Sequence, residues 1–119
     1  MPHVIPVCFA LAGDRCYIAI DEKPKRVKAV RLKRLRNIAE NSAVSLVADR
    51  YDANWSRLGY VLLQGHAHVL EGGAEHTEAL RLLRARYAPY RSMALEERPV
   101  IAVTIERAVD WGQLDSEVR

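Results

Sequence analysis

The sequence predicts a small antiparallel β-barrel that carries two helices, in the mainly β, α+β class of folds. Segments of strand character outnumber helical ones and short turns join several of them, which favours antiparallel pairing. No GxGxxG motif follows a predicted strand, which argues against a dinucleotide-binding Rossmann fold. With 119 residues, 50% of them hydrophobic and 28% charged, the chain is expected to form a single globular domain over residues 1–119.

Two apolar segments near the N-terminus predict a β-hairpin. They are HVIPVCFALA at residues 3–12 and RCYIAID at residues 15–21, joined by a two-residue Gly13-Asp14 turn. In this register Leu11 faces Cys16, and Cys8 lies three residues farther along its strand, so no disulfide is expected. Both cysteines are interpreted as small hydrophobic residues.

The most basic part of the chain ends in a predicted helix. Eight of the 18 Lys and Arg residues fall within residues 23–36. Apolar residues recur at helical spacing in the second half of this segment, namely Leu32, Leu35, Ile38 and Ala39. Arg31 and Arg34 border that stripe, where a guanidinium can form a bidentate contact with a phosphate. Spacing alone favours a solvated basic face over a site for a phosphate or an acidic ligand, and it favours a nucleic-acid surface least.

The middle of the chain predicts two more strands. Residues 43–49 form a short apolar strand, residues 50–56 have the composition of a loop, and a long strand covers residues 57–71. The two faces of the long strand carry Val61, Leu63, Ala67 and Val69 on one side and Leu62, Gln64, His66 and His68 on the other. Gly65 at its centre predicts a bulge or a bend of the kind that closes small barrels.

An amphipathic helix and a final strand complete the predicted elements. The helix covers residues 74–87, residues 88–98 form a connection, and residues 99–107 form the last strand. Side chains expected to point inward from the helix are Leu80, Leu83 and Tyr87, and those expected to point largely outward are Arg81, Arg84 and Arg86.

Histidine positions give little support for metal binding or hydrolysis. His66 and His68 share one strand face and could hold a metal ion with a third ligand, but no HExxH or paired-cysteine motif supplies one. We expect a solvent-facing or interface pair. None of the four histidines has a partnered nucleophile at a recognisable spacing, so a hydrolase is not expected.

Sequence length and hydropathy indicate a cytoplasmic protein that self-association would stabilise. The N-terminus lacks a basic region ahead of a sustained apolar run, and no apolar stretch is long enough to span a membrane. Cytoplasm is therefore the expected compartment, with no membrane partner. A chain this short builds one modest core, so a homodimer is the expected assembly.

Several segments in order resemble one known family. They are PHVIPVCFAL, RCYIAID, LKRLRNIAENSAVSLV, DRYDANWS and GHAHVL, and the resemblance extends from Pro2 to about Trp111. This combination resembles the pyridoxamine 5'-phosphate oxidase-like split β-barrel proteins, most closely the actinobacterial branch that uses a deazaflavin coenzyme, factor 420, in place of FMN. The resemblance implies a dimeric oxidoreductase that transfers hydride to or from a small substrate, with the cofactor ring at the dimer interface.

The resemblance also implies which residues bind the cofactor. A basic residue three positions before an Asn holds the phosphate in this family, a pattern that falls on Arg34 and Asn37, with Lys33 beside them. The remaining expected contacts to the ring or the substrate come from Ala19, Ile20, Tyr51, Trp55, Arg57, Tyr60 and Trp111. No catalytic acid or base is implied, because the cofactor carries the chemistry.

The leading basic run favours a cofactor with an acidic tail. Factor 420 carries an oligoglutamate tail beyond its phosphate and FMN does not. The residues expected to meet those carboxylates are Lys23, Lys25, Arg26 and Lys28. An FMN-dependent reductase or oxidase is the alternative within the fold, followed by a non-catalytic cofactor carrier and, more weakly, a nucleic-acid-binding module. The family normally has a helix and strand before the PHVIPV-like strand, so we expect either that the start site is placed late or that the sheet lacks a strand and has an exposed edge.

Overall fold

The computed structural model describes residues 6–20, 35–50 and 53–112, and these form five strands and two α-helices in the predicted order. Residues 35–40 form the first helix and α2 (Ala74–Arg86) the second. Two short 3-10 helices, η1 (Trp55–Arg57) and η2 (Ala88–Ser92), lie in the connections. The strands are β1 (Phe9–Ala12), β2 (Arg15–Ala19), β3 (Ala43–Arg50), β4 (Gly59–Leu70) and β5 (Val100–Gly112). No helix among these residues is long and apolar enough to cross a membrane.

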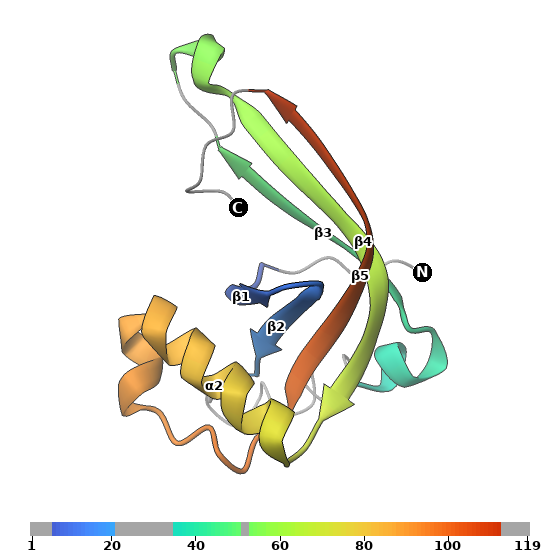
Figure 1. Ribbon diagram of the computed structural model, residues 1–119, viewed down its shortest axis with the longest axis vertical. Helices are drawn as coiled ribbons and strands as arrows, with labels where there is room; N and C mark the ends of the chain where they lie inside the picture. The colour runs from blue at the N-terminus through green and yellow to red at the C-terminus, as the bar shows by residue number, and fades with distance from the viewer. Residues whose placement is uncertain (1–5, 21–34, 51–52, 113–119) are drawn as a thin grey trace.

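All neighbouring strands pair antiparallel in one sheet of order β1-β2-β5-β4-β3. Strands β4 and β5 are the longest and bend as they cross the molecule, so that β2 pairs with the beginning of β5 and β3 with the beginning of β4 (Figure 1). We call the part built from residues 45–50 of β3, residues 59–64 of β4 and residues 107–112 of β5 the distal half of the sheet. The remainder, with β1 and β2, is the proximal half.

The N-terminal hairpin has the predicted turn and register. Gly13 has a φ of +60°, a conformation that glycine adopts without strain, and Leu11 pairs with Cys16. Cys8 and Cys16 are free, the first exposed and the second buried. Strand β1 begins only at Phe9, because residues 6–8 form no regular structure.

A β-bulge interrupts the pairing of β4 with β5 at Gly65. Gln64 pairs with Arg107 and Gly65 with Ile105, so that Glu106 is the extra residue on β5. A Cβ atom on Gly65 would lie 2.0 Å from the carbonyl oxygen of Thr104, so only glycine allows the two backbones to approach this closely. The bulge predicted from Gly65 is confirmed.

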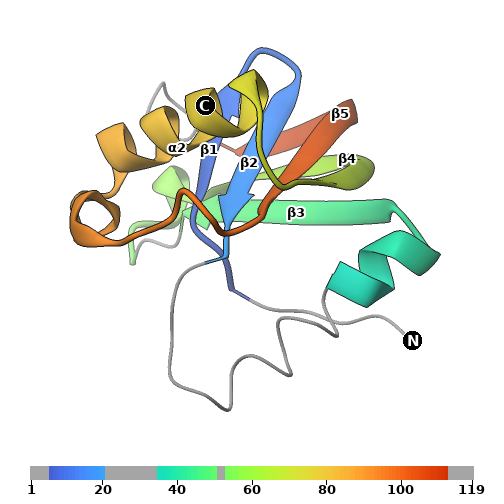
Figure 2. The same ribbon diagram turned by 90° about the horizontal axis from the view of Figure 1, so that it is seen from below.

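Two hydrophobic cores lie on opposite faces of the proximal half. Cys16, Ile18 and Val103 are in the barrel core, to which both sheet edges contribute, β1 through Phe9 and β3 through Val44. Since side chains from both edges meet there, the sheet curls around this core as a barrel does (Figure 2). The second core, which we call the helix-side core, lies between the other face of the sheet and α2. It includes Tyr17, Leu80, Leu83, Leu95 and Ala102.

The first helix covers the barrel core with a narrower stripe than predicted. Leu35 and Ile38 pack against that core, whereas Ala39 is exposed. Leu35 and Ile38 are three residues apart and share one line along the helix, and Ala39 is turned away by about 100° from Ile38. The prediction of an inward Ala39 was therefore wrong, and Leu32 lies outside the described residues.

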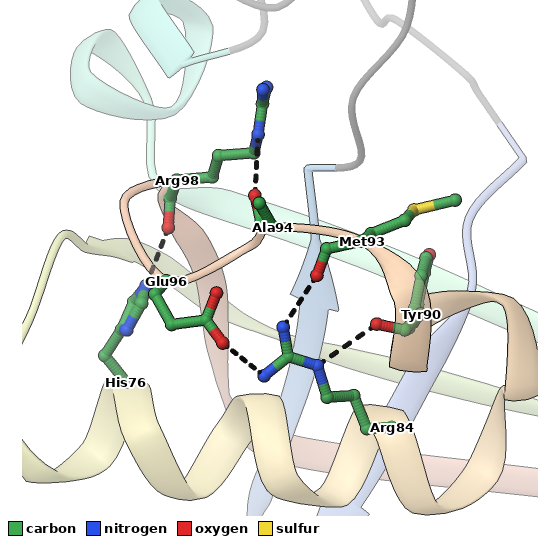
Figure 3. Close-up of polar contacts among 7 residues, drawn as sticks. All are labelled: His76, Arg84, Tyr90, Met93, Ala94, Glu96 and Arg98. Carbon is green, nitrogen blue, oxygen red and sulfur yellow. Dashed lines mark hydrogen bonds and ion pairs between the residues drawn. The ribbon is translucent and has the colours of Figure 1, made fainter.

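Arg84 on α2 is half-buried, which contradicts its predicted outward position. Its Nε donates to the carbonyl of Tyr90 at 3.1 Å and one Nη to that of Met93 at 2.8 Å, while Glu96 forms an ion pair with it at 2.7 Å (Figure 3). The connection after α2 folds back over the helix and presents backbone carbonyls that need donors, which explains the orientation. Buried His76 contacts the carbonyl of Arg98 through Nε2 at 2.6 Å. Arg81 and Arg86 are exposed as expected.

Strand β5 is longer than the predicted segment 99–107. It continues to Gly112, because residues 107–112 pair with the first half of β4. This extension brings Trp111 into the sheet opposite Tyr60.

Tyr87, at the end of α2, bonds to the outer edge of β1. Its hydroxyl accepts from the Phe9 N–H at 3.1 Å and donates to the Phe9 carbonyl at 3.0 Å. The guanidinium of Arg86 lies 4.5 Å from the centre of the Phe9 ring. Within the described residues β1 is a sheet edge, as expected, and these contacts cover part of it.

We predict that Gly65→Ala destabilises the protein by about 3 kcal/mol, because the new methyl group forces the two backbones apart at the bulge. Urea denaturation followed by circular dichroism measures the change. Gly72→Ala is the matched control, since a Cβ atom there meets nothing within 4 Å, and it should stay within about 0.5 kcal/mol of wild type. Equal stability of the two variants would contradict the bulge.

We predict that Tyr87→Phe lowers the free energy of unfolding by about 1–2 kcal/mol, because the Phe9 N–H and carbonyl lose their partner. Thermal and urea denaturation of the variant measure this loss. Tyr60→Phe removes a hydroxyl from the exposed distal half and should leave stability nearly unchanged. A Tyr87→Phe protein as stable as Tyr60→Phe would show that the edge contact contributes nothing.

Candidate functional site

The distal half carries an uncovered apolar sheet face. Val47, Leu62 and Val109 are cross-strand neighbours in one row, and Tyr60 and Trp111 are neighbours in the next. This is the same face on which α2 packs in the proximal half, but α2 ends before it reaches the distal half (Figure 1). Val47 is 62% exposed and Trp111 56% exposed. Large apolar side chains grouped in this way mark a binding surface.

Tyr60 and Trp111 form a stacked aromatic pair on this face. Their ring centroids lie 5.9 Å apart at an interplanar angle of 23°. Antiparallel pairing sets this arrangement, because the two residues are direct cross-strand partners. Tyr60 is 38% exposed, so both rings offer aromatic surface to a ligand. The structure thus brings together two of the predicted ring contacts.

Trp55 and Arg57 lie on η1, at the tip of the distal half (Figure 1). Asn54 caps this short helix, since its Oδ1 accepts from the backbone N–H of Ser56 at 3.2 Å and from the Ser56 hydroxyl at 2.7 Å. The cap holds the turn that carries Trp55, whose side chain is 77% exposed. Arg57 is exposed as well. Tyr51 lies outside the described residues.

Within one chain, the first helix, where the cofactor phosphate is predicted to bind, lies far from these aromatic residues. Asn37 is half-buried in the first helix, and its carbonyl accepts from the Asn41 N–H at 2.9 Å. That helix precedes Ala43, the first residue of β3, whereas Tyr60 pairs with Asp49, six residues along the strand. Six residues of extended strand span about 20 Å. The other phosphate and tail candidates lie outside the described residues: Lys33, Arg34, Lys23, Lys25, Arg26 and Lys28.

Ala19 and Ile20, predicted to run beside the ring, are both buried. Ala19 belongs to the helix-side core and Ile20 to the barrel core. Their side chains are therefore committed to packing, and a cofactor passing this strand end would meet backbone.

The structure forms a polar cluster at the start of β3 that spacing in the sequence did not predict. Ser42 Oγ lies 2.9 Å from His66 Nδ1, and His66 Nε2 lies 3.1 Å from Glu106 Oε1. His66 therefore has a hydroxyl partner that spacing in the sequence did not identify, because strand pairing brings together residues that lie far apart in the chain. The only local signal for this was the bulge at Gly65, which positions Glu106.

Neither His66 nor His68 belongs to a metal site in the described part of the chain. Both are exposed, as predicted. No group of three or more His, Cys, Asp or Glu side chains gathers there with the geometry of a metal site. Arg15 contacts His68 Nε2 at 3.4 Å and forms an ion pair with Glu75 at 3.0 Å. These contacts tie α2 to the sheet.

Cys16 is unsuited to a redox or nucleophilic role. Burial raises the pKa of its thiol from 9.0 to about 11, an effect that the nearby Arg86 charge only partly offsets. The thiol therefore stays protonated at neutral pH. This agrees with its interpretation as a small hydrophobic residue.

Comparison with known proteins establishes the family. Residues 1–109 match the sequence profile of pyridoxamine 5'-phosphate oxidase. The chain belongs to the pyridoxamine 5'-phosphate oxidase family. No protein of curated function matches the sequence closely enough to refine this assignment.

Solved structures share the fold of this pyridoxamine 5'-phosphate oxidase family member at low identity. A haem-binding protein from Mycobacterium smegmatis has a TM-score of 0.64 and 17% identity over 89% of this chain. A conserved hypothetical protein from Mycobacterium tuberculosis has a TM-score of 0.66 and 19% identity over 94% of it. A putative 5-nitroimidazole antibiotic resistance protein from Bacteroides thetaiotaomicron has a TM-score of 0.58 and 14% identity over 92% of this chain. The matches cover 41%, 69% and 68% of those chains, respectively.

Proposed function

We propose that this protein is a homodimeric oxidoreductase that binds the deazaflavin coenzyme factor 420 and transfers hydride to or from a small substrate. FMN is the alternative cofactor. The observation that carries the proposal is the stacked Tyr60–Trp111 pair on an uncovered apolar sheet face. Flavins and deazaflavins present a planar ring of three fused cycles, and such a ring is bound between apolar and aromatic walls.

The distal face fits a planar ring. Tyr60 and Trp111 supply aromatic surface, and Val47, Leu62 and Val109 supply the apolar floor beside it. The bound cofactor would accept or donate the hydride. The chain's own residues would orient the ring and keep water from it, which requires no acid or base of their own.

A second copy would complete the site. One chain separates Asn37 from Tyr60 by about 20 Å of β3, so a compact cofactor cannot touch both ends from a single protomer. A partner's first helix laid near the distal face would unite the two ends. The partner would also cover the exposed Val47, Tyr60 and Trp111. The geometry therefore supports the homodimer expected from chain length.

The choice of factor 420 over FMN rests on the basic run at residues 23–28. Four positive side chains there suit the acidic tail that FMN lacks, each exposed pair contributing roughly 0.2–1 kcal/mol in a salt-dependent way. Tailed and tail-less forms of the deazaflavin thus offer a direct test of this segment.

Haem is less well supported as the ligand, although a protein of the same fold binds it. His66 and His68 are the exposed histidines on the sheet, and both already have polar contacts. His66 uses both ring nitrogens, with Ser42 and Glu106, and His68 meets Arg15 through Nε2. Haem ligation by either would first have to break these contacts.

Cofactor titration tests the proposed function. We expect factor 420 to bind the wild-type protein, and Arg34→Ala to weaken binding about 10–100-fold through loss of a charge-assisted phosphate contact. Trp111→Ala should weaken it about tenfold. Fluorescence titration measures each dissociation constant, and Arg36→Ala, at an exposed position of the first helix, is the control that should bind normally.

Comparison of ligands separates the alternatives. Tighter binding of FMN than of factor 420 would favour the FMN enzyme, and binding without turnover across a substrate panel would favour a carrier. Equal affinity and salt dependence for tailed and tail-less deazaflavin would remove the role of residues 23–28. Binding of duplex DNA with a steep salt dependence, and of neither cofactor, would overturn the proposal.

The dimer is tested at Val47. We expect the wild-type protein to be a dimer by size-exclusion chromatography with light scattering, and Val47→Glu to be a monomer, because a buried unpaired carboxylate opposes association. Ala85→Glu places the same charge on an exposed position of α2 and should remain dimeric. A monomeric wild type that still binds cofactor would contradict a shared site.

A further inference from the structure

A chain of polar side chains crosses three strands of the sheet in the proximal half. Ser42 directly precedes β3, His66 lies on β4 and Glu106 is the bulge residue of β5. Ser42 Oγ is 2.9 Å from His66 Nδ1, and Glu106 Oε1 is 3.1 Å from His66 Nε2. Hydroxyl, imidazole and carboxylate thus follow one another at hydrogen-bond distance, as in a serine nucleophile with its base and orienting acid.

Backbone contacts position both ends of this chain. The Ala67 N–H donates to the Ser42 carbonyl at 2.8 Å, which holds the residue before β3 against β4. At the other end the bulge at Gly65 inserts Glu106 into β5. Glu106 is the extra residue of this bulge, and its Oε1 lies 3.1 Å from His66 Nε2.

The partners of His66 determine its neutral tautomer. The Glu106 carboxylate, 3.1 Å from Nε2, favours the neutral tautomer that carries its proton on that nitrogen, since a negative charge attracts the N–H dipole. In that tautomer Nδ1 accepts a hydrogen bond from the Ser42 hydroxyl. The ring is therefore oriented to act as a general base toward Ser42. His66 is exposed and Ser42 half-buried, so a small reagent can reach the pair.

We propose that Ser42 and His66 form an acyl-transfer site for small activated esters, with Glu106 as its positioning residue. In the first step a bond forms between Ser42 Oγ and the acyl carbon, and the bond from that carbon to the leaving oxygen breaks. The Ser42 proton passes to His66 Nδ1 and then to the departing alkoxide. Water next attacks the acyl group with the same base, which restores the serine and releases the acid.

Local backbone amides limit the reaction to good leaving groups. The Ala43 N–H donates to Asn41 Oδ1 at 3.1 Å, and the Ala67 N–H is bonded to Ser42 itself. These amides are engaged and do not stabilise an oxyanion. The acceleration then comes from general-base assistance, about 10²-fold, which is enough for an activated ester and too little for a peptide.

The site is separate from the proposed ring surface. His66 and Tyr60 lie on the same strand face, six residues apart, which places them about 20 Å from each other in one chain. Substitution of Tyr60 or Trp111 can therefore disrupt ring binding without changing Ser42 or His66, so that failure of one proposal leaves the other in place.

Acylation by p-nitrophenyl acetate tests the proposal. We expect an early release of p-nitrophenolate from the full chain and an acetyl group on Ser42, located by peptide mass spectrometry. Ser42→Ala should abolish this acetylation, and His66→Ala should slow it by about 10²-fold. Ser45→Ala and His68→Ala are matched controls on neighbouring strand positions and should react as wild type does. Acetylation of other side chains alone, or an unchanged rate in His66→Ala, would overturn the proposal.

The positioning role of Glu106 has a spectroscopic test. Long-range nitrogen-proton NMR should show the Nε2–H tautomer for His66 in the wild-type protein. Glu106→Ala should reduce that preference and slow Ser42 acetylation several-fold, while the His68 spectrum stays unchanged. A variant with the wild-type His66 tautomer and the wild-type rate would exclude this role.

Discussion

The close approach of the β4 and β5 backbones at Gly65 is the constraint on which the rest of the structure depends. These two strands form the long central pair of the described sheet, and β2 and β3 pair with its opposite sides. A side chain at Gly65 would collide with the Thr104 carbonyl, so the bulge exists only with glycine there. A bulge bends its strands and increases their twist, which lets the sheet curl around Val103 and still extend to Trp111.

This bend gives the two halves different surroundings. In the proximal half α2 covers one face and the curled sheet covers the other, so apolar residues such as Leu83 and Val103 are buried. In the distal half none of the described helices reaches the face that carries Val47 and Trp111 (Figure 1). Stability therefore resides mainly in the proximal half, and the exposed apolar face lies on the distal half.

Much of the fold could be predicted because its signals are local. The Gly13-Asp14 turn sets the hairpin register, Gly65 marks the bulge, and the spacing of Leu80 and Leu83 identifies α2. Arg84 was misplaced because its partners are carbonyls of an irregular connection, which leave no pattern in the sequence. The contact of Ser42 with Glu106 through His66 and the extension of β5 to Trp111 depend on strand pairing over long distances in the chain. Among the site residues, Tyr60, Trp55 and Trp111 were chosen by resemblance to a family, and only their mutual arrangement came from the structure.

The length of β3 has a consequence for how this chain can vary. From Ala43 to Arg50 every residue is paired with β4, without a break. Insertion or deletion of a single residue would move Leu46 out of the barrel core and place Val47 in it, reversing the apolar and exposed faces. Matched two-residue changes in both strands would preserve the faces but move η1 by about 7 Å relative to the first helix. Loops outside this hairpin can change length without this effect, whereas β3 and β4 can change length only together.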